Sequence, residues 1–144
     1  MNETKKIIAV FMLLAICLSL LPSCGKSELK IDGMEFNFAY VRAGDELTVR
    51  ACSSSFADKY EGAKVMDYTL SANKKVLTVT GDDGTYTGEY KVSKRYDESV
   101  LYEINIGSDP GFASLSEKAL ENGTVQYTLI LTIKGYYVTF IAEK

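Results

Sequence analysis

The side chains of this 144-residue chain that could carry chemistry are three cysteines, nineteen carboxylates and ten tyrosines. The chain has no histidine, which excludes His-dependent catalytic triads, His-ligated zinc and haem held by His. Cys52 could in principle be a nucleophile. An isolated thiol of this kind more often packs as a small hydrophobic residue, so we expect Cys52 to be buried and unreactive.

The carboxylates include two adjacent pairs, Asp45-Glu46 and Asp82-Asp83. A calcium-binding EF-hand needs acidic residues that alternate across twelve positions, and neither pair meets that pattern. We interpret both pairs as solvent-exposed turns. The sequence therefore predicts no metal site, no cofactor and no catalytic residue.

The balance of charge excludes a further class of protein. The chain has 16 Lys and Arg against 19 Asp and Glu, a formal net charge of −3. Proteins that bind nucleic acid carry a clear surplus of basic residues, because they neutralise phosphates. We expect no nucleic-acid partner.

The N-terminal 23 residues have the composition of a secretory signal peptide. Lys5 and Lys6 give a positive start, and residues 7–21 are almost entirely apolar. A membrane-spanning helix is the alternative, but it needs about 20 apolar residues. This run is slightly shorter, and Pro22 ends it.

The end of the apolar run, Leu21-Pro22-Ser23-Cys24, resembles the lipobox of bacterial lipoprotein precursors. The resemblance implies cleavage between Ser23 and Cys24, and attachment of diacylglycerol and a further acyl chain to Cys24. Residues 24–28 would then be a lipidated tether. The protein would be held on the membrane of the bacterial cell envelope, outside the cytoplasm. The alternative is that Cys24 is the first cysteine of a secreted domain and pairs with Cys52.

Residues 29–144 read as a single β-rich domain. Apolar and polar residues alternate with period two between turn signals spaced about 8–12 residues apart, which is typical of antiparallel strands. The turn signals include Asn73-Lys74-Lys75, Gly81-Asp82-Asp83-Gly84 and Lys134-Gly135. We expect about eight strands that pair in sequence order.

The segment after residue 108 departs from this alternation. Phe112, Leu115 and Ala119 are spaced i, i+3 and i+7, as on one face of a helix. Pro110 suits a first helical turn, and Gly123 suits the position after a helix end. The spacing predicts one short helix near residues 110–122.

The hairpin pattern across residues 68–93 is similar to small lipocalin-like bacterial lipoprotein domains. That resemblance implies an antiparallel barrel, although the chain has no Trp and so lacks the early Gly-x-Trp of true lipocalins. An immunoglobulin-like β-sandwich is the alternative fold.

These observations favour a monomeric, membrane-anchored envelope lipoprotein with a non-catalytic binding domain. Its partner would be a small apolar ligand or an envelope protein. The aromatic residues that we expect to face inward, and so to line a ligand site, are Phe36, Phe38, Tyr40, Tyr86, Tyr90 and Tyr102. A small carboxylate-dependent envelope enzyme and a structural or inhibitor module stay open as alternatives.

Overall fold

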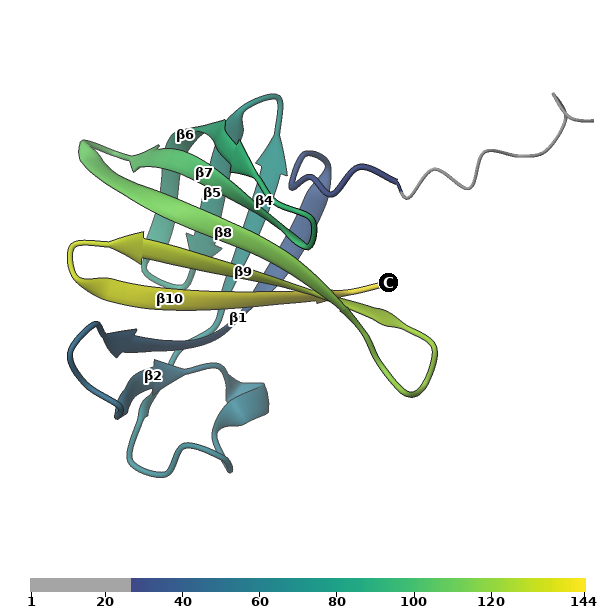
Figure 1. Ribbon diagram of the computed structural model, residues 1–144. Coiled ribbons are helices and arrows are strands. Elements are labelled where there is room, and N and C mark those ends of the chain that lie inside the picture. Colours follow the sequence, from purple (N-terminus) through teal and green to yellow (C-terminus); the bar gives the residue numbers. More distant parts are fainter. Residues whose placement is uncertain (1–26) are drawn as a thin grey trace, which may run out of the picture.

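The computed structural model describes residues 27–144, and the predicted signal peptide and Cys24 lie outside this range. Ten strands and one 3₁₀ turn make up the described part (Figure 1). The strands are β1 (Met34–Ala43), β2 (Val49–Cys52), β3 (Lys64–Val65), β4 (Tyr68–Asn73), β5 (Val76–Gly81), β6 (Gly84–Arg95), β7 (Ser99–Ile106), β8 (Asp109–Ala119), β9 (Val125–Ile133) and β10 (Tyr136–Glu143); the 3₁₀ turn η1 is Ser54–Phe56.

Eight of the strands close into an antiparallel barrel. Strands β4 to β10 pair in sequence order, and β1 pairs with both β4 and β10. Closure removes the exposed strand edges that would otherwise invite aggregation. The prediction of a mainly β, lipocalin-like barrel is confirmed, and the sandwich alternative is wrong because one continuous sheet closes on itself. The short strands β2 and β3 extend the sheet beside β1, outside the barrel.

Two-residue turns join several of the strands, at positions that the sequence predicted. Asp82 and Asp83 lie between the paired residues Gly81 and Gly84. The other turns place residues in the left-handed region: Lys74 has a φ of 48°, Lys75 of 66° and Lys134 of 50°. These values match the twist that tight hairpins require.

The predicted helix near residues 110–122 is wrong, because this segment forms the long strand β8. It pairs with β7 on one side and β9 on the other. Ala113 and Leu115 alternate inward and are fully buried, whereas Phe112 points outward and is 50% exposed. Of the three residues with helical spacing, only Leu115 is buried, and Phe112 and Ala119 are both exposed. Two flanking strands satisfy the backbone of β8 in a way that an isolated amphipathic turn could not.

Strand β1 is irregular, and this decides the direction of one aromatic side chain. The register of β1 against β10 shifts between Phe38 and Tyr40, as in a β-bulge. Phe38 stays in the core, but Tyr40 points out of the barrel and packs against Phe56 and Tyr60, with ring centroids 6.5 Å and 5.3 Å away. The expectation that Tyr40 faces inward was therefore wrong.

Candidate functional site

One end of the barrel is covered by the N-terminal segment, residues 29–33. Ile31 is completely buried in the hydrophobic core. Its backbone N–H donates a hydrogen bond to the Tyr102 hydroxyl at 3.2 Å. The Arg95 guanidinium donates to the backbone carbonyl of Leu29 at 2.9 Å. This segment closes one end of the barrel.

Asp32 fastens the same segment to the β4–β5 turn and to β6. Its Oδ1 accepts hydrogen bonds from the Lys74 N–H at 2.7 Å and from the Tyr90 hydroxyl at 2.9 Å. The bonds from Tyr90 and Lys74 hold the pKa of Asp32 below its usual value. Burial, together with the bond to Asp32, raises the pKa of Tyr90 to about 12.

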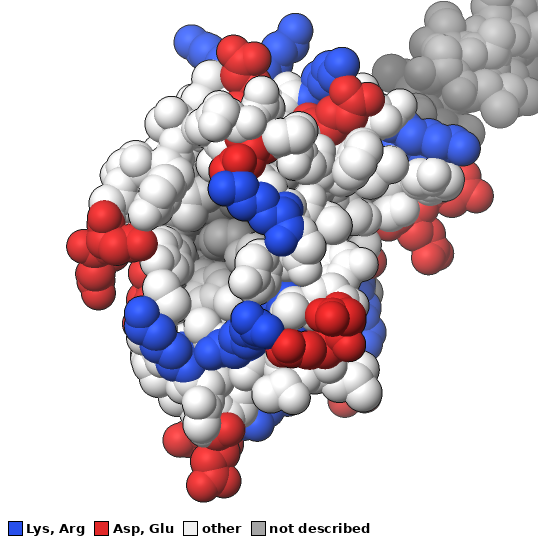
Figure 2. Space-filling view, turned by 90° about the vertical axis from the view of Figure 1, so that its left-hand side faces the viewer, with Lys and Arg blue, Asp and Glu red and all other residues white. Residues whose placement is uncertain are grey.

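The opposite end of the barrel is open. The β7–β8 and β9–β10 hairpin tips lie at this end, on the left of Figure 1, while the N-terminal segment and the C-terminus lie on the right. Figure 2 looks onto the open end and shows a hollow surrounded by charged side chains. We call this hollow the barrel mouth. It has a volume of about 320 Å³ and is lined by Phe38, Val41, Met66, Tyr68, Val79, Asp83, Tyr86, Val138 and Phe140.

A second depression enlarges the mouth toward the β7–β8 and β9–β10 turns. It has a volume of about 630 Å³ and shares Val41, Tyr86 and Val138 with the barrel mouth. Both volumes fall within or close to the range of small-molecule pockets. The walls of the barrel mouth come from five neighbouring strands, β10, β1, β4, β5 and β6.

Aromatic rings form the inner wall of the mouth. The Phe38 ring contacts Tyr68 and Phe140 edge-on, with centroids 5.8 Å away in both cases. The Tyr68 ring lies directly over Gly81, its partner across the β4–β5 ladder, where a Cβ would collide with the ring. Gly81 therefore leaves the space that the Tyr68 ring occupies.

One carboxylate and two phenols supply the polar groups of the mouth. The Tyr86 hydroxyl donates a hydrogen bond to Asp83 Oδ2 at 3.0 Å. This bond raises the pKa of Tyr86. Burial, followed by a hydrogen bond to Asp83, raises the pKa of Tyr68 to about 12. Both phenols thus stay protonated at neutral pH, and the Tyr86 hydroxyl is directed at the carboxylate.

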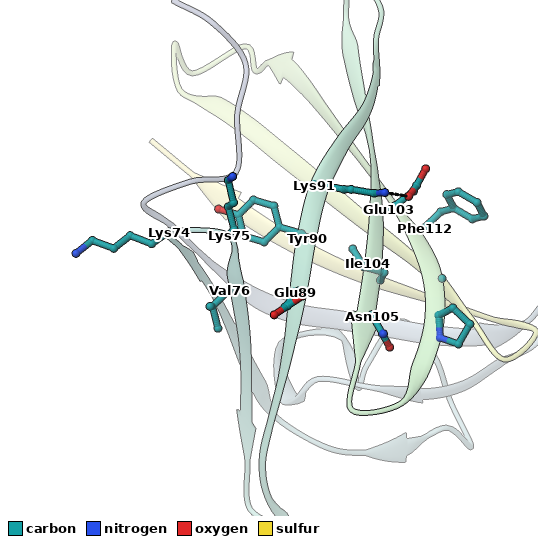
Figure 3. Close-up of a pocket in the computed structure, with 12 residues that line it drawn as sticks. Lys74, Lys75, Val76, Glu89, Tyr90, Lys91, Glu103, Ile104, Asn105 and Phe112 are labelled. Carbon is teal, nitrogen blue, oxygen red and sulfur yellow. Dashed lines mark ion pairs between the residues drawn. The ribbon is translucent and has the colours of Figure 1, made fainter.

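A larger hollow lies on the outer surface of the barrel, across β5 to β8, with a volume of about 780 Å³ (Figure 3). Lys91 and Glu103 form an ion pair of 2.7 Å across it. Phe112 stands on one side, and Lys75 and Val76 on the other. The outer groove is lined by residues of the outer face of the sheet, whereas the mouth draws its lining from side chains at the open end of the barrel interior. We therefore take the mouth as the candidate site.

The six aromatic residues predicted to line a ligand site lie in three different parts of the structure. Phe38 and Tyr86 line the mouth. Phe36, Tyr90 and Tyr102 are buried in the packed half of the barrel, near the closed end, and Tyr40 lies outside. Among the remaining tyrosines, Tyr96 and Tyr136 are exposed and Tyr60 is half-buried.

Sequence reasoning did not select most of the residues that form the mouth. Tyr68, Val79, Val138 and Phe140 are inward positions at strand ends next to the open-end turns, and that position was a usable signal. Val41 and Met66 carried no such signal. Val41 faces inward because of the bulge in β1, and Met66 lies between β3 and β4.

The remaining chemistry of the described residues is limited. Within residues 27–144, no three His, Cys, Asp or Glu side chains converge in a way that could hold a metal ion. Cys52 is free and fully buried, as the sequence predicted. No helix in this part of the chain is long and apolar enough to cross a membrane. The arrangement at the mouth is suited to holding an apolar group and a hydrogen-bond donor.

Comparison of the chain with protein-family models, with curated proteins and with solved structures finds no match.

Proposed function

We propose that this protein is a lipid-anchored envelope lipoprotein whose barrel binds a small apolar ligand in its mouth, without catalysis. The observation that carries the binding proposal is the hollow at the open end. Apolar and aromatic side chains from five strands line it, and Asp83 is its charged group. Binding sites for small molecules combine such walls with few polar groups.

The two ends of the barrel fit this proposal in different ways. Residues 29–33 enter at the closed end, and Cys24 precedes them by only a few residues. Four tether residues span at most ~14 Å. A lipid on Cys24 would therefore keep the closed end near the bilayer, and the mouth would face away from it. A ligand could then reach the mouth from the aqueous side.

The test of this function fills the mouth with a side chain. Val79→Phe adds a ring to the mouth, whereas Val76→Phe adds the same ring to the outer face of the same strand, in the outer groove. The full chain, inserted in lipid nanodiscs, is titrated calorimetrically with a panel of small water-soluble aromatic and alkyl compounds. Empty nanodiscs are the blank.

We expect binding of at least one compound to the wild type, loss of that binding in Val79→Phe and retention in Val76→Phe. Thermal unfolding of both variants shows whether each is folded. Loss of binding in Val76→Phe alone would move the site to the outer groove. Absence of binding by every compound would contradict the ligand proposal and favour a protein partner.

A further inference from the structure

On the polar side of the barrel mouth, an existing hydrogen bond holds acceptor atoms in place. The Tyr86 hydroxyl uses its proton in the 3.0 Å bond to Asp83 Oδ2. Tyr68 lines the mouth beside it, where burial and the Asp83 carboxylate raise the pKa of its hydroxyl. A phenol that donates its proton keeps only lone pairs for other partners. A ligand that enters here meets the Asp83 carboxylate and the Tyr86 oxygen, which both accept.

The neighbouring cations contact groups other than Asp83. Lys134 pairs with Asp109 at 2.8 Å, and Arg50 pairs with Glu46 at 2.6 Å. Arg42 lies over the Tyr137 ring, 5.4 Å from its centroid. Among the described residues, no ion pair involves Asp83. The negative charge of Asp83 therefore has two phenols near it and is not paired with a cation among the described residues.

The aromatic walls favour the same kind of ligand. Phe38, Tyr68, Tyr86 and Phe140 all line the hollow. The negative face of an aromatic ring attracts a positive charge within about 6 Å of its centroid. The apolar walls would hold the body of a ligand, and the rings and the carboxylate would both favour a positive head group.

We infer that the mouth selects small amphiphiles whose head group is an ammonium or another hydrogen-bond donor, and rejects those that end in a carboxylate. This inference rests on the proposed function, because it assigns the ligand class of the same hollow. The carboxylate of a wrong ligand would face Asp83 across the pocket. Juxtaposed like charges disfavour binding, and opposite charges favour it.

A matched series of ligands tests this selection. The probes are 4-phenylbutylamine, 4-phenylbutan-1-ol and 4-phenylbutanoic acid, which share one apolar body and differ in the head group. Calorimetric titration of the full chain in nanodiscs at pH 7, with empty nanodiscs subtracted, measures each Kd. We expect the amine to bind at least about tenfold more tightly than the acid, with the alcohol between them.

Two variants of one turn assign the effect to a single carboxylate. Asp83→Asn removes the charge that the phenols face, and we expect it to reduce the preference for the amine over the acid to about twofold or less. Asp82→Asn removes the same charge from the exposed neighbour, which does not line the hollow, and should preserve most of the preference. Asn is as compatible with a turn as Asp, so both variants should fold.

The outcomes separate this inference from the function on which it rests. If the acid binds as tightly as the amine, or if Asp82→Asn and Asp83→Asn have equal effects on the preference, the inference that Asp83 selects the head group is wrong. The proposed function survives in both cases, because the mouth still binds ligands. If no member of the series binds and the wider panel also fails, the proposed function itself is contradicted. If the wider panel contains a ligand but only carboxylates bind, the inference is overturned.

Discussion

The backbone N–H of Ile31 donates to the hydroxyl of Tyr102 across 3.2 Å, although the two residues are 71 positions apart in the chain. Tyr102 stands on β7, and its side chain is 1% exposed. The bond gives a buried backbone donor its partner and allows Ile31 to enter the core. The segment before β1 thereby becomes the closed end of the barrel.

Replacing Tyr102 with Phe should destabilise the protein by about 1–3 kcal/mol, because the buried Ile31 N–H loses its acceptor while the ring is kept. Urea denaturation measures the change in the free energy of unfolding. Tyr96→Phe is the control, since Tyr96 is 53% exposed and should change stability by less than about 0.5 kcal/mol. Equal changes in the free energy of unfolding for the two variants would show that the hydrogen bond to Ile31 does not account for the loss of stability.

The hydrogen bonds to Asp32 should make stability depend on pH in the acid range. The folded state holds the pKa of this carboxyl below its usual value of about 4, so the unfolded chain binds the proton more readily. The contribution is therefore present above about pH 4 and is lost as the pH falls through the lower, folded-state pKa. In urea titrations between pH 7 and pH 2.5, the difference in unfolding free energy between wild type and Asp32→Asn should shrink over this range. A Glu35→Gln control on the exposed face of β1 should not reproduce the trend.

Gly81→Ala should disturb the mouth, because the new methyl group would occupy the space of the Tyr68 ring. We expect a loss of stability of about 1–3 kcal/mol from this overpacking, and weaker binding of any mouth ligand. Thr80→Ala, at the exposed position next to it, is the control. An unchanged Tyr68 environment in aromatic NMR spectra of Gly81→Ala would contradict the prediction.

The lipobox resemblance predicts that Cys24→Ala remains unprocessed or leaves the membrane fraction. Cell fractionation and metabolic labelling with a fatty acid measure these effects directly. Two or more acyl chains are needed for stable anchoring, so loss of the thiol should abolish the label and the retention together. An unlabelled wild type would rule out the lipoprotein assignment.

The thiol of Cys52 should react slowly with a thiol reagent until the protein unfolds, because the side chain is fully buried. Cys52→Val should cost on the order of 1 kcal/mol, from packing alone. The labelling rate is measured with and without denaturant. Rapid labelling of the native protein would contradict this prediction, because it would show that the C-terminal end of β2 opens and exposes the Cys52 thiol.

The turns and most strands were readable from the sequence because they depend on local chemistry. Asp82-Asp83 and Lys134-Gly135 both mark two-residue turns, and the alternation around them set the two faces of each strand. A chain of such hairpins already indicates an antiparallel meander. The proposed lipobox is likewise a local pattern, complete within four residues.

Other features depended on partners that lie far away in the sequence. The residues of β8 have a spacing compatible with a helix, and only pairing with β7 and β9 makes them a strand. Tyr40 alternates with Phe38 in the sequence, yet a bulge against β10 turns it outward. A bulge adds one residue to a ladder, so its effect on a side chain cannot be read from alternation alone.

The two ends of the barrel were likewise decided by tertiary structure. Alternation identifies inward residues but does not say which of them are packed and which line a hollow. Phe36 and Phe38 are both inward on β1, and only Phe38 reaches the mouth. Residues 29–33 fill the other end through bonds to Tyr102 and Tyr90, which stand on strands 58 or more positions away. The sequence by itself therefore determined the strands and their turns, because neighbouring residues specify them. The closed end and the open mouth depend on which distant side chains meet inside the barrel, and only the assembled barrel decides that.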